Sequence, residues 1–473
     1  MRQDAPSEVS GIARMGMLGQ AAATGALAGT AKPSERLWNR NFSLLWQGQL
    51  VSSVGKQAFA LTCMLAIKDL TGSGSVMGLL MAFAILPSVL LGPIAGVFVD
   101  RLDRRRLIAW TDIAGGLVVL LAFATLLSFR GNAPVIVAAL FAVTIATGLL
   151  DTFSQPAIGS AIPDLVPASR LEAANGLNLG GIQAAGFIAQ SLSGLLYRAL
   201  GATALTLVNA VTYLYAGITE LFISIPKTGR EYGSDSVPES GARGVRSVTR
   251  RSRNITLVWR TFSADLKEGL RFVVGHPGML ASLVSFAALN FFAAPILVTL
   301  PFYATDYLGQ GSEWYGFLMA AFGAGAIAGY VLVAARPSQG KGRAATVIGG
   351  LVLEACLIAL ALAPLPSFSF IVIIFTVGFA NGVVNVNIAT LFQLATPRGL
   401  LGRVNGLSQT LSAGAMPLGM ALSGVAFDLS GQNVPLMFSV SAVSMLAITL
   451  APIVLSRGYL RFLSTQLVPE NAK

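Results

Sequence analysis

An aspartate and several arginines follow one apolar stretch of the chain at a specific spacing. The pattern is Gly96-x-x-x-Asp100-Arg101-x-x-Arg104-Arg105, preceded by Gly92. It forms a short charged hairpin between apolar stretches at residues 75–99 and 106–129. Arginines in such a hairpin can meet water and lipid phosphates at one face of a membrane. A basic loop beside a membrane is usually only a topology signal, so the spacing is the more specific part of this pattern.

Five further charged residues fall inside apolar stretches, where each costs free energy and needs a reason. Asp112, Asp151 and Glu220 lie near one end of their stretches. We expect them to reach water or to pair with loop arginines, and the alternative is a role in coupling. Lys56 and Glu354 lie deeper.

Lys56 is about 14 residues, roughly 21 Å, from the start of its apolar stretch, too far from either surface to reach water easily. An ammonium group at that depth needs a counter-ion. One hypothesis is that the substrate supplies part of the missing charge, which favours anionic, siderophore-type cargo. The other is a permanent ion pair within the protein, for which Asp151 is a candidate.

Amide side chains could add uncharged polar groups to a substrate cavity. Asn381 and Asn385 are four residues apart and so share one face of a helix. Asn290 and Gln57, the neighbour of Lys56, are further candidates. Hydrogen bonding between helices is the alternative use of such amides.

The composition determines which elements position these residues. The chain has 473 residues, of which 54% are hydrophobic and 11% charged, against about 25% charged in ordinary soluble domains. Apolar runs of about 20 residues recur, each long enough to cross a bilayer. The sequence predicts an all-α polytopic membrane protein with twelve transmembrane helices, at 42–67, 75–99, 106–129, 133–154, 173–197, 202–225, 279–304, 313–335, 344–363, 367–393, 402–425 and 433–456.

The basic residues divide unequally between the two sets of loops. Of the 32 lysines and arginines, only Lys68, Arg130 and Arg198 fall in one set. With Lys56 inside a span, 28 remain for the other set and the tails. This asymmetry predicts that both termini are cytoplasmic. The net charge of +11 does not indicate nucleic acid, because the basic residues are distributed among loops.

The predicted organisation has two six-helix halves, at residues 41–225 and 279–457. A linker at 226–278 joins them, rich in Gly, Ser and Arg and ending in an amphipathic helix that we place at the membrane interface. Residues 1–40 and 458–473 are predicted as cytoplasmic tails, the first of them disordered.

An internal repeat supports the two halves. Asn175-Gly176-Leu177, Leu192-Ser193-Gly194 and Gly201 recur as Asn405-Gly406-Leu407, Leu422-Ser423-Gly424 and Gly431. The offset is 230 positions in every case. A fixed offset over so much chain predicts two pseudo-symmetric halves with a substrate site between them.

Two more stretches complete a family signature. They are Asn41-Phe42-x-Leu44-Leu45-Trp46-x-Gly48-Gln49 and Gln155-Pro156-Ala157-x-x-x-x-Ile162-Pro163-Asp164. With the Asp100 hairpin they resemble the major facilitator superfamily of secondary transporters, in the bacterial efflux branch that includes macrolide and enterobactin exporters. The resemblance implies a monomeric multi-pass protein of the bacterial inner membrane that exports a drug, siderophore or other secondary metabolite by alternating access. It also implies proton antiport, with the proton gradient as energy source and no cofactor.

The resemblance assigns roles to particular residues. The hairpin becomes a conformational switch formed by Gly92, Gly96, Asp100, Arg101, Arg104 and Arg105. Asp100 should lie near the start of span 11, beside Arg403, when the halves close on the cytoplasmic side. Spans 1, 4, 7 and 10 line the cavity in this family and span 9 is peripheral, which favours Lys56 as functional and Glu354 as structural.

Three departures from the family pattern limit what the resemblance implies. Asp103 replaces a usual glycine of the hairpin, and span 4 lacks the arginine of related drug/proton antiporters. Phe187 follows Gly186 where a proline is usual. Proton coupling is therefore implied by resemblance and not by identified coupling residues.

Other classes of protein remain as alternatives. An uptake symporter would use the same fold, and a membrane receptor or scaffold would not transport at all. The sequence has no phosphate-binding loop for ATP and no nucleophile–base or metal-ligand constellation, so an enzyme is not expected. The expected partners are a small-molecule substrate and the lipid bilayer.

Overall fold

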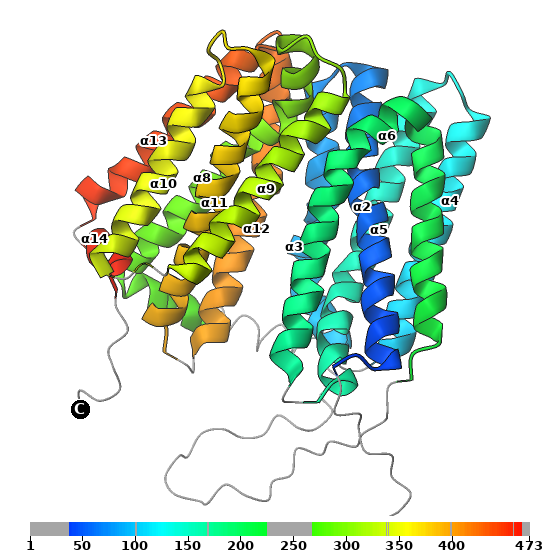
Figure 1. Ribbon diagram of the computed structural model, residues 1–473, viewed down its shortest axis with the longest axis horizontal. Coiled ribbons are helices and arrows are strands. Elements are labelled where there is room, and N and C mark those ends of the chain that lie inside the picture. Colours follow the sequence, from blue (N-terminus) through cyan, green and yellow to red (C-terminus); the bar gives the residue numbers. More distant parts are fainter. Residues whose placement is uncertain are drawn as a thin grey trace, which may run out of the picture.

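The computed structural model describes residues 37–99, 102–167, 170–224, 267–336, 338, 340–397, 400–456 and 458–465. Over these residues the secondary structure is helical, without strands. Figure 1 shows two helical bundles side by side, one coloured blue to green and the other green to red. The all-α prediction is confirmed for this part of the chain.

The described residues of the first half form five long helices. They are α2 (Arg40–Thr71), α3 (Gly74–Val99), α4 (Arg104–Ser128), α5 (Ala133–Leu165) and α6 (Leu171–Leu221). Asn39, Asp103 and Asn132 cap the first turns of α2, α4 and α5 by accepting a backbone N–H bond. Gly201 has non-helical angles (φ 74°, ψ 170°) and divides α6 into two helical segments.

The second half begins after a short helix at residues 267–274. Its elements are α8 (Pro277–Phe302), the π-helix η2 (Tyr303–Tyr307), α9 (Glu313–Ala335), α10 (Gly340–Leu360), α11 (Ser367–Ala395), α12 (Leu401–Leu429), α13 (Val434–Leu455) and α14 (Tyr459–Leu463). The linker before residue 267 lies outside the described residues.

Ten helices of the described chain are long and apolar enough to cross a membrane. One of them is α6, which the bend at Gly201 divides, and α12 adds a shorter apolar stretch at Gly414–Leu429. The predicted total of twelve stays a prediction.

The 230-residue repeat is visible in the helix boundaries. Helix α5 ends at Leu165 and α6 begins at Leu171, while α11 ends at Ala395 and α12 begins at Leu401. Gly201 and Gly431 both have positive φ, 74° and 69°, a conformation that glycine adopts without strain. The repeated residues therefore mark equivalent breaks in the two halves.

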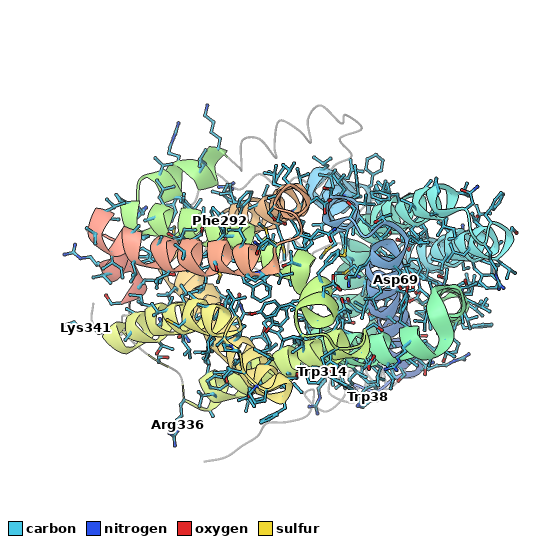
Figure 2. All side chains as sticks on the ribbon, turned by 90° about the horizontal axis from the view of Figure 1, so that it is seen from above. Trp38, Asp69, Phe292, Trp314, Arg336 and Lys341 are labelled. Carbon is cyan, nitrogen blue, oxygen red and sulfur yellow. The ribbon has the colours of Figure 1, made fainter. Side chains whose placement is uncertain are left out.

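The two ends of the molecule can be defined from the chain turns. The linker end contains the turns after α3, α5, α9 and α11, and the far end contains those after α2, α4, α10 and α12. The bundles touch at the far end and diverge towards the linker end (Figure 1). Arg336 and Lys341, which flank the α9–α10 turn at the linker end, lie at the edge of the molecule (Figure 2).

The halves meet mainly through two helix pairs, α3 with α12 and α6 with α9, and α3 also touches α8. Small residues permit this contact, since a Cβ atom at Gly424 would overlap the carbonyl group of Gly74, and one at Gly316 would overlap that of Ser191. Within the second half, Gly325 lies against the α11 backbone in the same way. The glycines of α9 thus serve close helix packing.

Candidate functional site

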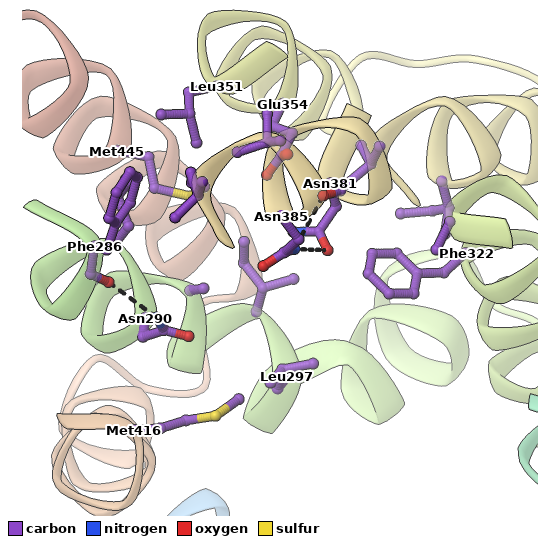
Figure 3. Close-up of a pocket in the computed structure, with 18 of the residues that line it drawn as sticks. Phe286, Asn290, Leu297, Phe322, Leu351, Glu354, Asn381, Asn385, Met416 and Met445 are labelled. Atoms are coloured by element: carbon purple, nitrogen blue, oxygen red, sulfur yellow. Dashed lines mark hydrogen bonds between the residues drawn. The ribbon is translucent and has the colours of Figure 1, made fainter. Parts of the chain in front are cut away.

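A cavity of about 880 Å³ lies between the two halves. Helices α8 to α12 form most of its wall, and α2 and α6 contribute Gln57 and the segment from Gln183 to Gln190. Figure 3 shows part of this wall, with side chains from several helices directed towards a common space. The volume falls within the range that small-molecule sites occupy.

The predicted amides line this cavity. Gln57, Asn290, Asn381 and Asn385 are all in its wall. Asn385 donates from Nδ2 to Asn381 Oδ1 at 2.8 Å, and Asn290 donates to the Phe286 carbonyl at 2.9 Å (Figure 3). Their amide oxygens and remaining N–H groups are available as polar contacts in an otherwise apolar wall.

Apolar side chains make up most of the remaining surface. They are flexible thioethers and aromatic rings from both halves, among them Met319, Met416, Met445, Phe187, Phe286, Phe322 and Phe392. Thioethers adapt to irregular shapes, and aromatic rings bind apolar or cationic groups. The wall suits a bulky, largely apolar organic molecule.

Glu354 was expected to have a structural role on a peripheral helix, but it lies in the cavity wall. Helix α10 packs between α11 and α13, and Gly350 allows it to approach Val384 of α11 closely. This packing directs the Glu354 carboxyl inward. Only 4% of the residue is exposed, and its Oε1 atom has no hydrogen-bond partner among the described residues.

Lys56 lies in a separate buried network within the first half. Its Nζ atom is 2.7 Å from Asp151 Oδ1 and 3.6 Å from Asp112 Oδ1. The same ammonium lies 4.8 Å from the centre of the Tyr213 ring. Neither Lys56 nor Asp151 is among the described residues of the cavity wall. The geometry is that of the ion-pair hypothesis.

Gln49 joins the other two acids of this network. Its Nε2 atom donates to Glu220 Oε1 at 2.7 Å and to Asp112 Oδ2 at 3.2 Å. Asp112 is 1% exposed and Glu220 is fully buried. The expectation that these acids reach water or loop arginines is therefore wrong, because α2, α4 and α6 enclose their carboxyl groups.

The network places three carboxyl groups near one ammonium. Glu220 forms no ion pair with any described residue, and its Oε2 atom has no hydrogen-bond partner there. Such an arrangement can hold a proton on one of the acids. Across the described residues no cluster of His, Cys, Asp or Glu could hold a metal ion.

The arginines of the charged hairpin contact their own half. Arg104 Nη1 is 2.6 Å from Asp164 Oδ2, so the start of α4 is tied to the end of α5. Arg105 donates to the Leu221 carbonyl at the end of α6. Asp103 caps α4, which gives the unusual residue of the hairpin a local function.

The remaining switch residues are placed only in part. Gly92 lies in α3 with no atom near the position of a Cβ, Gly96 is also in α3, and Asp100 and Arg101 lie outside the described residues. Arg403 Nη1 is 2.7 Å from Glu268 Oε2, so the start of α12 contacts the short helix before α8.

Asp428, near the end of α12, binds the start of α3 across the interface between the halves. Its carboxylate accepts from the Gly74 N–H at 2.8 Å, the Ser75 N–H at 2.8 Å and the Ser73 hydroxyl at 2.6 Å. An anion at a helix N-terminus is favoured by the unpaired N–H groups and the helix dipole. We refer to this contact as the Asp428 latch.

Two ion pairs join the halves at the same end. Lys68 Nζ is 2.9 Å from Asp306 Oδ1, and Arg198 pairs with Glu313. Between described residues, every hydrogen bond or ion pair that joins the two halves lies at this far end. The cavity is thus closed on that side.

Sequence reasoning missed three of these residues. Gln49 was noticed only as part of a family pattern, although it lies two helical turns before Lys56. Asp428 was unremarkable because it sits at the end of an apolar stretch, and Tyr213 carries no charge. The seven-residue spacing of Gln49 and Lys56, which puts both on one face of a helix, could have indicated that Gln49 belongs to the same network.

Comparison with known proteins agrees with this architecture. The family model described as Major Facilitator Superfamily matches residues 45–420. Macrolide efflux protein A of Streptococcus pyogenes is 24% identical over 406 residues, covering 84% of this chain and 91% of that protein. The protein of the same name from Enterococcus faecalis is 25% identical over 358 residues, covering 73% of this chain and all of that protein.

Solved structures show the same fold. A bacterial homologue of the iron transporter ferroportin, in an inward-facing state, superposes with a TM-score of 0.64 at 17% identity, covering 90% of this chain and 99% of that one. The nucleoside transporter NupG superposes with a TM-score of 0.64 at 11% identity, covering 88% and 99%.

The fold and the cavity between its halves define a polytopic membrane transporter, and not an enzyme. The chain belongs to the major facilitator superfamily.

Proposed function

We propose that this transporter exports a bulky, largely apolar organic molecule from the bacterial cytoplasm across the plasma membrane, by alternating access and in exchange for protons. The observation that carries the proposal is the cavity between the halves, closed at the far end by the Asp428 latch and two ion pairs. The relatives named macrolide efflux protein A support export, and macrolides are the first cargo to test.

In this proposal the present conformation faces the cytoplasm. The linker end carries the predicted excess of basic residues, and between described residues no hydrogen bond or ion pair joins the halves there. Cargo would enter from the linker end. Release at the far end requires the Asp428 latch to break, with the halves then closing at the linker end.

We assign the coupling proton to the network around Gln49. Lys56 is shared between Asp151 and Asp112, whereas Glu220 has no cationic partner among the described residues. An unpaired buried carboxylate costs several kcal/mol, and holding a proton removes that cost. Glu220 would take up a proton from the far side and release it to the cytoplasm. Gln49 and Asp112 are its immediate neighbours.

Inside-out membrane vesicles test direction and coupling together. Respiration acidifies their interior, so an exporter that exchanges cargo for protons should accumulate a radiolabelled macrolide. Nigericin, which collapses the pH gradient, should abolish the accumulation. Accumulation only in right-side-out vesicles would indicate the uptake symporter, and no accumulation in either kind would favour a receptor or scaffold, or exclude macrolides as cargo.

Glu220→Gln separates coupling from transport. The variant should lose accumulation driven by the pH gradient but retain exchange of labelled for unlabelled macrolide, since that exchange needs no proton. Asp69→Asn, which removes an acid outside the network that bonds only to Tyr197 of its own half among the described residues, should retain both. Gradient-driven accumulation at the wild-type rate by Glu220→Gln would contradict the assignment.

A further inference from the structure

The cavity contains one formally charged side chain among its described wall residues, and that residue is Glu354. The rest of the described wall is apolar or carries amides and hydroxyl groups. Glu354 is almost fully buried, and its Oε1 atom has no hydrogen-bond partner among the described residues. A buried carboxyl oxygen without a partner in the wall of a cavity calls for an explanation, and a group from outside the protein can complete its contacts.

The neighbouring amides complete those contacts only in part, because the Asn381 side chain interacts with the Glu354 carboxyl group while the Glu354 Oε1 atom keeps no partner among the described residues. Figure 3 shows Glu354 above Asn381 and Asn385, on the same side of the cavity. The Asn385 Nδ2 group is already bonded to the Asn381 side chain and to the Asn381 carbonyl, at 2.8 and 2.9 Å. The Asn290 Nδ2 group is bonded to the Phe286 carbonyl. The Asn385 and Asn290 amide groups thus bond within their own helices, and the Oε1 atom of Glu354 is left without a partner among the described residues.

The groups facing Glu354 suit a cation. Phe322 and Phe286 line the cavity with Met416 and Met445 (Figure 3). Aromatic rings attract cations through their faces, and thioethers adapt to bulky organic groups. Their attraction adds to that of the Glu354 carboxylate.

The buried lysine that the sequence suggested as a substrate ligand is already paired within the first half. Lys56 is paired with Asp151 and Asp112 in the first half and is absent from the described cavity wall. An anionic cargo would thus meet the carboxylate of Glu354 and find no cationic side chain among the described wall residues, and like charges in a desolvated site repel strongly. The siderophore-type hypothesis loses its support from Lys56.

We infer that the cargo is an organic cation, such as a protonated amine on an apolar skeleton, and that Glu354 binds its positive charge. This inference rests on the proposed export function and specifies its substrate class. Glu354 would be the residue that separates cations from anions of equal size and shape.

Two ions of matched shape and opposite charge provide the test. Tetraphenylphosphonium and tetraphenylborate share four phenyl groups around one centre, so binding differences report charge. Equilibrium binding to the purified protein in detergent should favour the phosphonium ion. Glu354→Gln should weaken phosphonium binding by about tenfold or more, the effect of one lost charge-assisted contact, without weakening borate binding.

Three controls make the result decisive. Glu354→Asp should keep the preference for the cation, and thermal unfolding should verify that each variant is folded. Glu268→Gln, which removes an equal charge outside the cavity, should bind both ions as the wild type does. Wild-type phosphonium affinity in folded Glu354→Gln, or a wild-type preference for borate, would overturn the inference.

The result is independent of the transport assay. Macrolide accumulation in inside-out vesicles together with unchanged phosphonium binding by Glu354→Gln would leave the export proposal standing and remove the role of Glu354. Phosphonium binding that depends on Glu354, in a protein that accumulates no macrolide, would support the role of Glu354 and contradict the export proposal.

Discussion

Equal spacing on two helices brings the buried charges of the first half together. Gln49 and Lys56 are seven residues apart on α2, and Tyr213 and Glu220 are seven apart on α6. Seven residues are two helical turns, so each pair lies on one face. The helices run antiparallel, which places Gln49 against Glu220 and Lys56 against Tyr213. The sequence contains this spacing, but the contacts can be inferred only once α2 is known to pack against α6.

Removing the cation from this network should destabilise the protein. Lys56→Met leaves the buried Asp112 carboxyl group and the partly exposed Asp151 carboxyl group without their ammonium, and breaking a fully buried pair costs about 3–5 kcal/mol. We expect low yield of folded protein, measured by fluorescence-detected size exclusion. Adding Asp112→Asn should restore much of the yield.

Lys341→Met is the control, because Lys341 is exposed at the linker end. Normal yield of Lys56→Met with selective loss of anionic cargo would instead favour the original hypothesis of Lys56 as a substrate ligand.

The polar residues of the cavity were predictable by type and depth, but Glu354 was not. Asn290, Asn381 and Asn385 lie on helices that were expected to line the cavity. All three residues are in the cavity wall. The direction of Glu354 depends on how α10 rotates against α11, which the close approach of Gly350 to Val384 sets. No property of α10 alone reveals that contact.

At the scale of elements, apolar runs located the helices well and their ends less well. The predicted spans at 75–99 and 367–393 match α3 (Gly74–Val99) and α11 (Ser367–Ala395) closely. Helix α5 was expected to end near residue 154 but continues to Leu165, through Pro156 and Pro163. Prolines are tolerated inside membrane helices because neighbouring groups satisfy the freed backbone.

The Asp428 latch should set how often the far end opens. Asp428→Asn removes the charge and one of the two carboxylate oxygens that accept from the start of α3. We expect the equilibrium to shift towards opening by about 1–2 kcal/mol, or roughly 5- to 30-fold in population. Spin labels at Arg130 and Leu365, on far-end turns of the two halves, should report longer distances.

Asp69→Asn is the matched control for this shift. Asp69 lies at the same end and carries the same charge, but it accepts from Tyr197 of its own half. Its removal should leave the distance distribution unchanged. An unchanged distribution in Asp428→Asn would show that the latch does not hold the far end closed.

For the whole molecule, the repeat predicted two halves but not how they are placed. The 230-residue offset reappears in the helix boundaries and in the positive φ of Gly201 and Gly431. The contacts that close the far end join residues far apart in sequence, such as Ser73 and Asp428, separated by 355 positions. The closed end differs between conformational states of a transporter. The hydrophobic pattern of the sequence therefore cannot predict which end is closed in this structure.

The charge asymmetry predicts the orientation of the molecule in the membrane. In a background lacking Cys63 and Cys356, a cysteine at Ser128 on the far end should react with an impermeant maleimide added to intact cells. A cysteine at Ser338 on the linker end should react only after the cells are opened. Labelling of the Ser338 variant in intact cells would reverse the proposed direction of export.

Helices α3 and α12 lie side by side across the interface, and an aspartate occurs at the end of each. Asp428 near the end of α12 holds the start of α3, and Asp100 follows the last residue of α3. If Asp100 holds the start of α12 in the opposite state, as the family resemblance implies, the two contacts are mutually exclusive. Each then lowers the energy of one end state and neither lowers the barrier. If the two contacts contribute equally, a chain lacking both aspartates would keep its balance between states and exchange between them faster than the native transporter.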